Sequence, residues 1–276
     1  MEDRRRQATL TKRTLKRFGA CEAAVLAGAL SHFGTLAIVP FLMVGAGFLG
    51  TVPSEGALEL SEFGTTEAYE SFARPVRAFL PFVDAEMARD VRELVRKHAW
   101  DDFGGVLALL ITASLFGWCL RRIHRRVLGT ADERGFVAER VQVFVFLVAA
   151  LALTGISSVF WHGLDLMVSD TARDSIFSTA ILALGFIVSV RWSGRGRMAL
   201  KSLAKGALLF CAGWQGAMWL FARYVESQGF YSTYGTLGGV ACVMVWLYYA
   251  SLVYVLAMCM VAECDLEGAS KGNRGD

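Results

Sequence analysis

Basic residues alternate from one polar segment to the next along this chain, and that alternation limits its fold more than any other feature. Long apolar runs divide the 276 residues into seven polar segments. The segments before Phe18, from Arg121 to Arg140, from Arg191 to Lys205 and after Ala262 hold 20 of the 28 Lys and Arg residues. The other three hold 8 basic and 15 acidic residues. Loops rich in Lys and Arg remain in the cytoplasm. The pattern predicts an all-α integral membrane protein with six transmembrane helices and both termini cytoplasmic.

The apolar runs also divide the chain into parts. A hydrophobic fraction of 55% agrees with a membrane protein. Residues 1–17 are predicted to form a basic cytoplasmic arm, and residues 18–276 a six-helix transmembrane domain. The predicted spans are about 20–50, 103–120, 141–161, 175–192, 206–222 and 234–262. The first and last exceed the roughly 20 residues that a bilayer requires, so we expect them to tilt.

The segment 53–102, between the first two spans, is predicted to be helical and to lie on the outer side. From Asp84 its apolar residues recur with the period of an amphipathic helix. A second helical piece, Glu67 to Phe79, is interrupted by Pro75. Three interpretations remain open for this segment: a lid over the bundle, a surface helix, or a binding site for an envelope protein.

Motifs of enzymes and of cofactor sites are absent from the sequence. It contains no HExxH, GxSxG, Walker or dinucleotide-binding motif, and its cysteines and histidines lack zinc-site spacing. We therefore expect no enzymatic activity, no catalytic residue, no cofactor and no metal. Because the basic residues flank apolar spans, we expect membrane lipids as partners and no nucleic acid.

Three groups of polar residues are candidate sites. The first would bind a lipid phosphate or another anionic head group, although anchoring to the cytoplasmic leaflet alone also explains such clusters. It comprises Arg121, Arg122, Arg125, Arg126, Arg191, Arg195 and Arg197. The second would line a polar path through the membrane, or would instead form hydrogen bonds between neighbouring helices. It comprises His32, Thr35, Ser157 and Gln215.

The third candidate is Glu263, near the end of the last span. A carboxylate near a helix C-terminus opposes the helix dipole and favours a nearby cation. We predict an ion pair of Glu263 with Arg121 or Arg122 that closes the cytoplasmic end of the bundle. The alternative is that Glu263 lies in head-group water and pairs with nothing.

The last apolar run carries a resemblance to a known family. From Tyr234 it reads YGTLGGVACVMVWLYYASLVYVLAMCMVAECDL. Its Tyr-Gly pair, its Trp246-Leu247-Tyr248 triplet and its Ala262-Glu263 pair resemble the last helix of the YihY or virulence factor BrkB family of bacterial inner-membrane proteins. The segments LAGALSHFGTLAIVPFLMV and Arg134-Gly135-Phe136 also resemble that family. Val261, Cys264 and Asp265 depart from its usual Gly, Leu and Asn.

The resemblance covers essentially the whole chain and implies a function class. It implies a six-helix bundle in the bacterial inner membrane, linked to envelope lipid handling and once mislabelled ribonuclease BN. With the basic cytoplasmic rims, it favours a protein that transports or translocates an amphipathic envelope component such as a lipid. The alternative is a non-transporting scaffold for envelope assembly that binds a partner through residues 53–102. We expect no ribonuclease activity, because the candidate pair Asp101-Asp102 falls on the outer side.

Overall fold

The described part of the chain is entirely helical. A computed structural model describes residues 2–50, 103–129, 170–193, 198–228 and 230–272. These residues form α1 (Glu2–Ala20), α2 (Ala23–Gly50), α5 (Phe103–Leu128), α7 (Asp170–Ser193), α8 (Leu200–Gln228) and α9 (Phe230–Gly272). No strand occurs among the described residues, so the all-α prediction is confirmed for them. The predicted third span, 141–161, and the outer segment, 53–102, lie outside the described residues.

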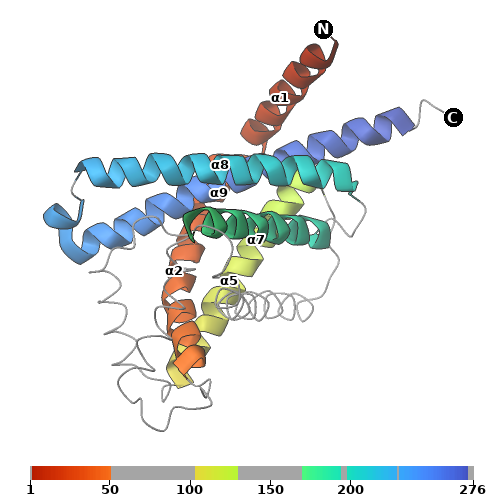
Figure 1. Ribbon diagram of the computed structural model, residues 1–276. Coiled ribbons are helices and arrows are strands. Elements are labelled where there is room, and N and C mark those ends of the chain that lie inside the picture. Colours follow the sequence, from red (N-terminus) through yellow and green to blue (C-terminus); the bar gives the residue numbers. More distant parts are fainter. Residues whose placement is uncertain (1, 51–102, 130–169, 194–197, 229, 273–276) are drawn as a thin grey trace.

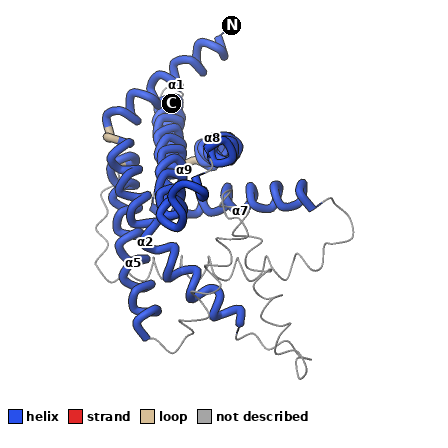
Figure 2. The backbone as a smooth tube through the Cα atoms, turned by 90° about the vertical axis from the view of Figure 1, so that its left-hand side faces the viewer, coloured by secondary structure: helices blue, strands red, loops and turns tan. Residues whose placement is uncertain are grey.

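Helix α9 is the element around which the others pack. It contacts α1, α2, α5 and α8. In Figure 1, α8 and α9 run side by side, α7 lies along α8, and α2 and α5 run across this layer. Figure 2, turned by 90°, shows α2 and α5 on one side of α9 and α8 on the other. Helices far apart in sequence thus enclose a common interior.

The core follows α9. Its fully buried side chains include Trp246, Val255 and Met258. Helix α8 approaches α9 closely at Gly206, where an added Cβ would lie 3.2 Å from the Ala257 carbonyl oxygen. Small residues let two membrane helices come this close, and the close approach stabilises their packing through van der Waals contacts between the backbones.

Several described helices are apolar enough for a membrane. Leu107–Leu128 and Ala241–Gly268 are each long and apolar enough to cross a bilayer. Thr9–Ala20 and Ala23–Ile38 together make a third candidate, bent by 65° at their junction. Thr179–Trp192 is a shorter apolar helix. These helices are those of a membrane protein; the six spans and their orientation stay predictions.

Several helix boundaries differ from the predicted spans: α8 begins six residues before residue 206, and α9 continues ten residues beyond residue 262. Helix α5 continues to Leu128, eight residues beyond the predicted end at residue 120, so the basic cluster that follows this span is helical. The predicted first span began at Ala20, but the chain turns at Cys21 and Glu22 before α2 begins. Glu22 adopts a left-handed conformation with φ 56°, and its carbonyl accepts hydrogen bonds from the N–H groups of Val25 and Leu26.

Candidate functional site

A cavity lies between α2, α5, α7, α8 and α9. Its volume is about 590 Å³, within the range of about 300–1,000 Å³ that small-molecule sites occupy. Its walls are mostly aliphatic and aromatic. They include Leu30 and Ile38 of α2, Phe116 of α5, Trp214 of α8 and Leu247 of α9. Such a wall favours a hydrocarbon ligand over a polar solute.

Helix α5 presents one stripe of residues to this cavity. The stripe consists of Leu109, Ala113, Phe116, Gly117, Leu120, Arg121 and His124. The spacing of three and four residues keeps these side chains on one face of the helix. The stripe begins with apolar residues and ends with an arginine and a histidine, so the cavity changes from apolar to polar along α5.

The polar end of the cavity holds a chain of hydrogen bonds that links three helices. His124 Nδ1 lies 2.7 Å from the Leu120 carbonyl oxygen, and because a carbonyl only accepts, Nδ1 carries the hydrogen and donates it. His124 Nε2 lies 2.9 Å from the Tyr254 hydroxyl, which is 2.7 Å from Ser189 Oγ. Ser189 Oγ also lies 2.9 Å from the Phe186 carbonyl oxygen, and its one hydrogen is donated either to that carbonyl or to Tyr254. Buried polar groups that are paired in this way hold α5, α7 and α9 in one arrangement.

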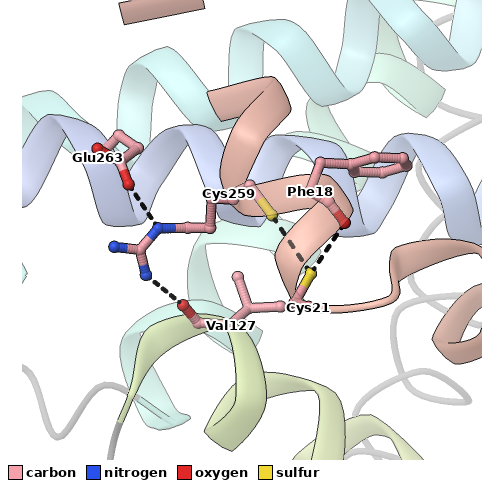
Figure 3. A network of polar contacts seen from close by, with 6 residues as sticks. Phe18, Cys21, Val127, Cys259 and Glu263 are labelled. Atoms are coloured by element: carbon pink, nitrogen blue, oxygen red, sulfur yellow. Dashed lines mark hydrogen bonds and ion pairs between the residues drawn. The ribbon is translucent and has the colours of Figure 1, made fainter. Parts of the chain in front are cut away.

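A second group of contacts joins the end of α1 to α5 and α9. Arg17 donates from Nε to Glu263 Oε1 at 2.6 Å and from Nη1 to the Val127 carbonyl at 2.9 Å. Dashed lines in Figure 3 join both acceptors to this guanidinium. Beside it, Cys21 Sγ lies 4.0 Å from Cys259 Sγ. We call these contacts the Arg17 clamp.

The start of α8 lies at the same end of the bundle. The Ala199 N–H, just before α8, donates to Asp265 Oδ1 of α9 at 3.0 Å. With the Arg17 clamp, this contact brings together the starts of α2 and α8, the end of α5 and the C-terminal part of α9. The polar end of the cavity faces the same way, since His124 precedes Val127 by one turn on α5. We call this the basic end of the bundle.

The predicted partner of Glu263 was an arginine of α5. The structure places Arg17 against Glu263. The ion pair therefore exists with an arginine that sequence reasoning did not name, and a contact with Arg121 or Arg122 stays a prediction. The side chains of Arg17 and Glu263 are 27% and 14% exposed, so their pair is shielded from water.

The predicted head-group arginines do not share one environment. Arg121 is 5% exposed and lines the cavity, whereas its neighbour Arg122 is exposed and stacks over Trp118 at 5.5 Å. Arg126 is exposed and pairs with Glu22 at 3.4 Å. Arg125 and Arg191 are also exposed, and Arg195 and Arg197 lie outside the described residues.

The described members of the predicted polar path make contacts between or within helices. Gln215 Nε2 of α8 donates to Thr179 Oγ1 of α7 at 2.7 Å, and Thr35 donates to the Ser31 carbonyl of its own helix at 2.9 Å. His32 is exposed at the surface. The cavity wall is formed by other residues. Ser157 lies outside the described residues, and the path stays a prediction.

Sequence reasoning missed Ser189 and Tyr254 as site residues. One signal pointed to Tyr254: a polar group within an apolar span is costly unless it faces the bundle interior. No comparable signal marked Arg17, because it is one of seven basic residues in the first 17.

The fold and the site define a class: a helical membrane protein with a mostly apolar cavity between its helices. Comparison with known families then gives the family. The sequence model of the family described as virulence factor BrkB matches residues 14–275, and the chain belongs to this family. The resemblance seen in the last span is thereby confirmed. The family description names no enzymatic activity.

A relative from Bacillus subtilis (strain 168) is named putative ribonuclease-like protein YfkH. It is 23% identical to this chain over 170 residues, which cover 55% of this chain and 61% of the relative. The match therefore spans less than two thirds of that relative's length. No solved structure matches the chain.

Proposed function

We propose that this chain is a multi-pass protein of the bacterial inner membrane that moves an amphipathic envelope component, such as a lipid, through the cavity between its helices. One observation carries the proposal. The five helices surround about 590 Å³ of mostly apolar space, with Arg121 and His124 at its basic end. An amphipathic molecule has the same division into apolar and polar parts.

The arrangement of helix ends supports cytoplasmic termini. The starts of α2 and α8, the end of α5 and the C-terminal part of α9 meet at the basic end, as they would if both termini faced the cytoplasm. Exposed basic residues gather there, including Arg125, Arg126 and Lys201. Positive residues near the ends of spans favour the anionic cytoplasmic leaflet.

The ribonuclease name belongs to the relative and is not carried over to this chain. The sequence holds no nuclease motif that would support hydrolysis of RNA by this chain. Among the residues that the structure describes, no three His, Cys, Asp or Glu side chains are grouped as metal ligands would be.

Lipid movement across reconstituted vesicles tests the proposal. The protein is placed in liposomes that contain a trace of lipid with a fluorescent head group, and a membrane-impermeant reductant reports how much label reaches the outer leaflet. The wild type is expected to accelerate transfer over empty liposomes. Gly185→Leu is expected to remove this acceleration, because Gly185 lines the cavity and an added Cβ there meets no atom within 4 Å.

Gly216→Leu is the matched control. Gly216 is an exposed helical glycine of α8 that likewise has no atom within 4 Å of an added Cβ. We expect this variant to transfer lipid as the wild type does. Lipid transfer by the wild type no faster than in empty liposomes would contradict the proposal and favour the scaffold. Transfer by Gly185→Leu as fast as by the wild type would mean that the lipid does not pass through this cavity.

A further inference from the structure

The cavity is elongated. Its wall extends along α5 from Leu109 to His124, about 22 Å at about 1.5 Å per residue, and along α2 from Leu30 to Ile38, about 12 Å. The apolar part of the wall is therefore long enough for an extended hydrocarbon chain and suits one.

The polar groups of the cavity all lie at one end. Five lining residues carry charged, imidazole or hydroxyl groups: Arg121, His124, Ser189, Ser251 and Tyr254. Arg121 and His124 lie in the last two turns of α5, and Ser189 lies near the end of α7. Ser251 and Tyr254 lie in the middle of α9. Apart from the indole N–H of Trp214, the rest of the wall is apolar or glycine. A ligand is therefore expected to bind in one orientation, with its polar group toward the basic end.

Arg121 is the permanently charged residue at this polar end. Its side chain is only 5% exposed although it lies on a helix apolar enough to cross a membrane. A cation at such depth is costly, and it normally faces a cavity or the bundle interior. Arginine stays charged and offers five donors in a planar fork, which matches a carboxylate or a phosphate. The same stripe of α5 carries this charge and the apolar wall.

We infer that the cavity binds an extended acyl chain whose anionic group lies at the basic end against Arg121. This inference rests on the proposed function and narrows its substrate class. Free fatty acids and one chain of an anionic phospholipid share this chemistry. Of the seven predicted head-group arginines, the inference assigns this role to Arg121, which is buried in the described part of the chain.

Fluorescence quenching tests the inference, because Trp214 lies in the cavity wall. The probes are a fatty acid and a fatty alcohol of equal length, each brominated on the chain, added to the full protein in a nonionic detergent. Quenching is compared with that of Trp214→Phe to isolate the cavity signal among the chain's seven tryptophans. The wild type is expected to bind the acid more tightly than the alcohol.

Substitution of the arginine should remove that preference. Arg121→Gln is expected to weaken acid binding about tenfold or more, as loss of a charge-assisted hydrogen bond does, and to leave alcohol binding nearly unchanged. Arg122→Gln removes the adjacent exposed charge and is expected to weaken acid binding much less. If Arg121→Gln does not fold, Arg121→Lys serves instead and is expected to keep the preference for the acid.

Three results would overturn the inference. They are equal binding of acid and alcohol by the wild type, equal loss in Arg121→Gln and Arg122→Gln, and unchanged quenching in Gly185→Leu. The protein reconstituted in vesicles in which only phosphatidylglycerol carries the brominated chain distinguishes a membrane lipid from a free acid. Binding without movement of lipid would leave the inference standing and contradict the proposed transport. Movement of lipid by a protein that binds the acid and the alcohol equally would contradict the inference and leave the proposed transport standing.

Discussion

At the scale of single residues, Arg17 links three helices outside the cavity. It joins α1 to the carboxylate of Glu263 on α9 and to the backbone of α5 at Val127. The Val127 carbonyl lies in the last turn of α5, where helix carbonyls lack partners within the helix. Arg17 therefore satisfies one such carbonyl and neutralises Glu263, whose side chain is only 14% exposed.

Charge exchange tests this pair. We expect Glu263→Arg to lower the free energy of unfolding by about 1.5–3 kcal/mol, the range for a hydrogen bond to a charged group, because two like charges would then meet at the clamp. Arg17→Glu in the same chain should restore much of that loss. The measurement is thermal unfolding in detergent. Rescue by Arg122→Glu in place of Arg17→Glu would instead support the pair predicted from sequence.

At the scale of helices, the contact of α8 with α9 depends on glycine. At Gly206 an added Cβ would lie 3.1 Å from Phe186 Cε1 and 3.2 Å from the Ala257 carbonyl oxygen. At Gly213 it would lie 2.5 Å from Val253 Cγ1. Backbone and β-branched atoms yield little, so a methyl group at either position must push the two helices apart.

Gly206→Ala is therefore expected to destabilise the protein by about 1–3 kcal/mol, as overpacking of a core does. Gly216→Ala, on the same helix where an added Cβ meets nothing within 4 Å, is the control. It should be neutral or stabilising, since alanine favours helix over glycine by about 1 kcal/mol. Unfolding of both variants by denaturant in detergent gives the comparison. Equal stability of the two would contradict the close approach of α8 and α9.

The helices themselves were largely predictable, because the length of an apolar run sets the existence of a membrane helix. The turn at Cys21 and Glu22 was not, since the apolar run begins before it and a left-handed Glu22 leaves no local signal. The burial of Arg121 beside the exposed Arg122 was not predictable either. It depends on which face of α5 meets α9, and adjacent residues on a helix point about 100° apart.

At the scale of the whole molecule, the predicted topology has a direct consequence. Epitope tags at either terminus should be hidden from antibody in intact spheroplasts and become accessible after permeabilisation. A tag within residues 53–102 should be accessible in both. These results are expected because loops rich in Lys and Arg remain in the cytoplasm. A terminus accessible in intact spheroplasts would contradict the cytoplasmic placement of the basic end.

The cavity is the other feature of the whole molecule, since five helices from both halves of the chain contribute to it. None of these helices alone forms a site. The hydrogen bonds of His124, Tyr254 and Ser189 hold three of the five together at one end. Binding of an acyl chain is thus expected to require the assembled bundle.

Native mass spectrometry of the protein released from nanodiscs of bacterial phospholipid tests lipid binding in this cavity most directly. The wild type and Gly216→Leu are predicted to retain bound lipid, enriched in anionic species, and Gly185→Leu to lose it. An unrelated helical membrane protein of similar size shows how much lipid is carried nonspecifically. Lipid retention by the wild type no greater than by that protein, or undiminished in Gly185→Leu, would contradict a lipid site between these helices.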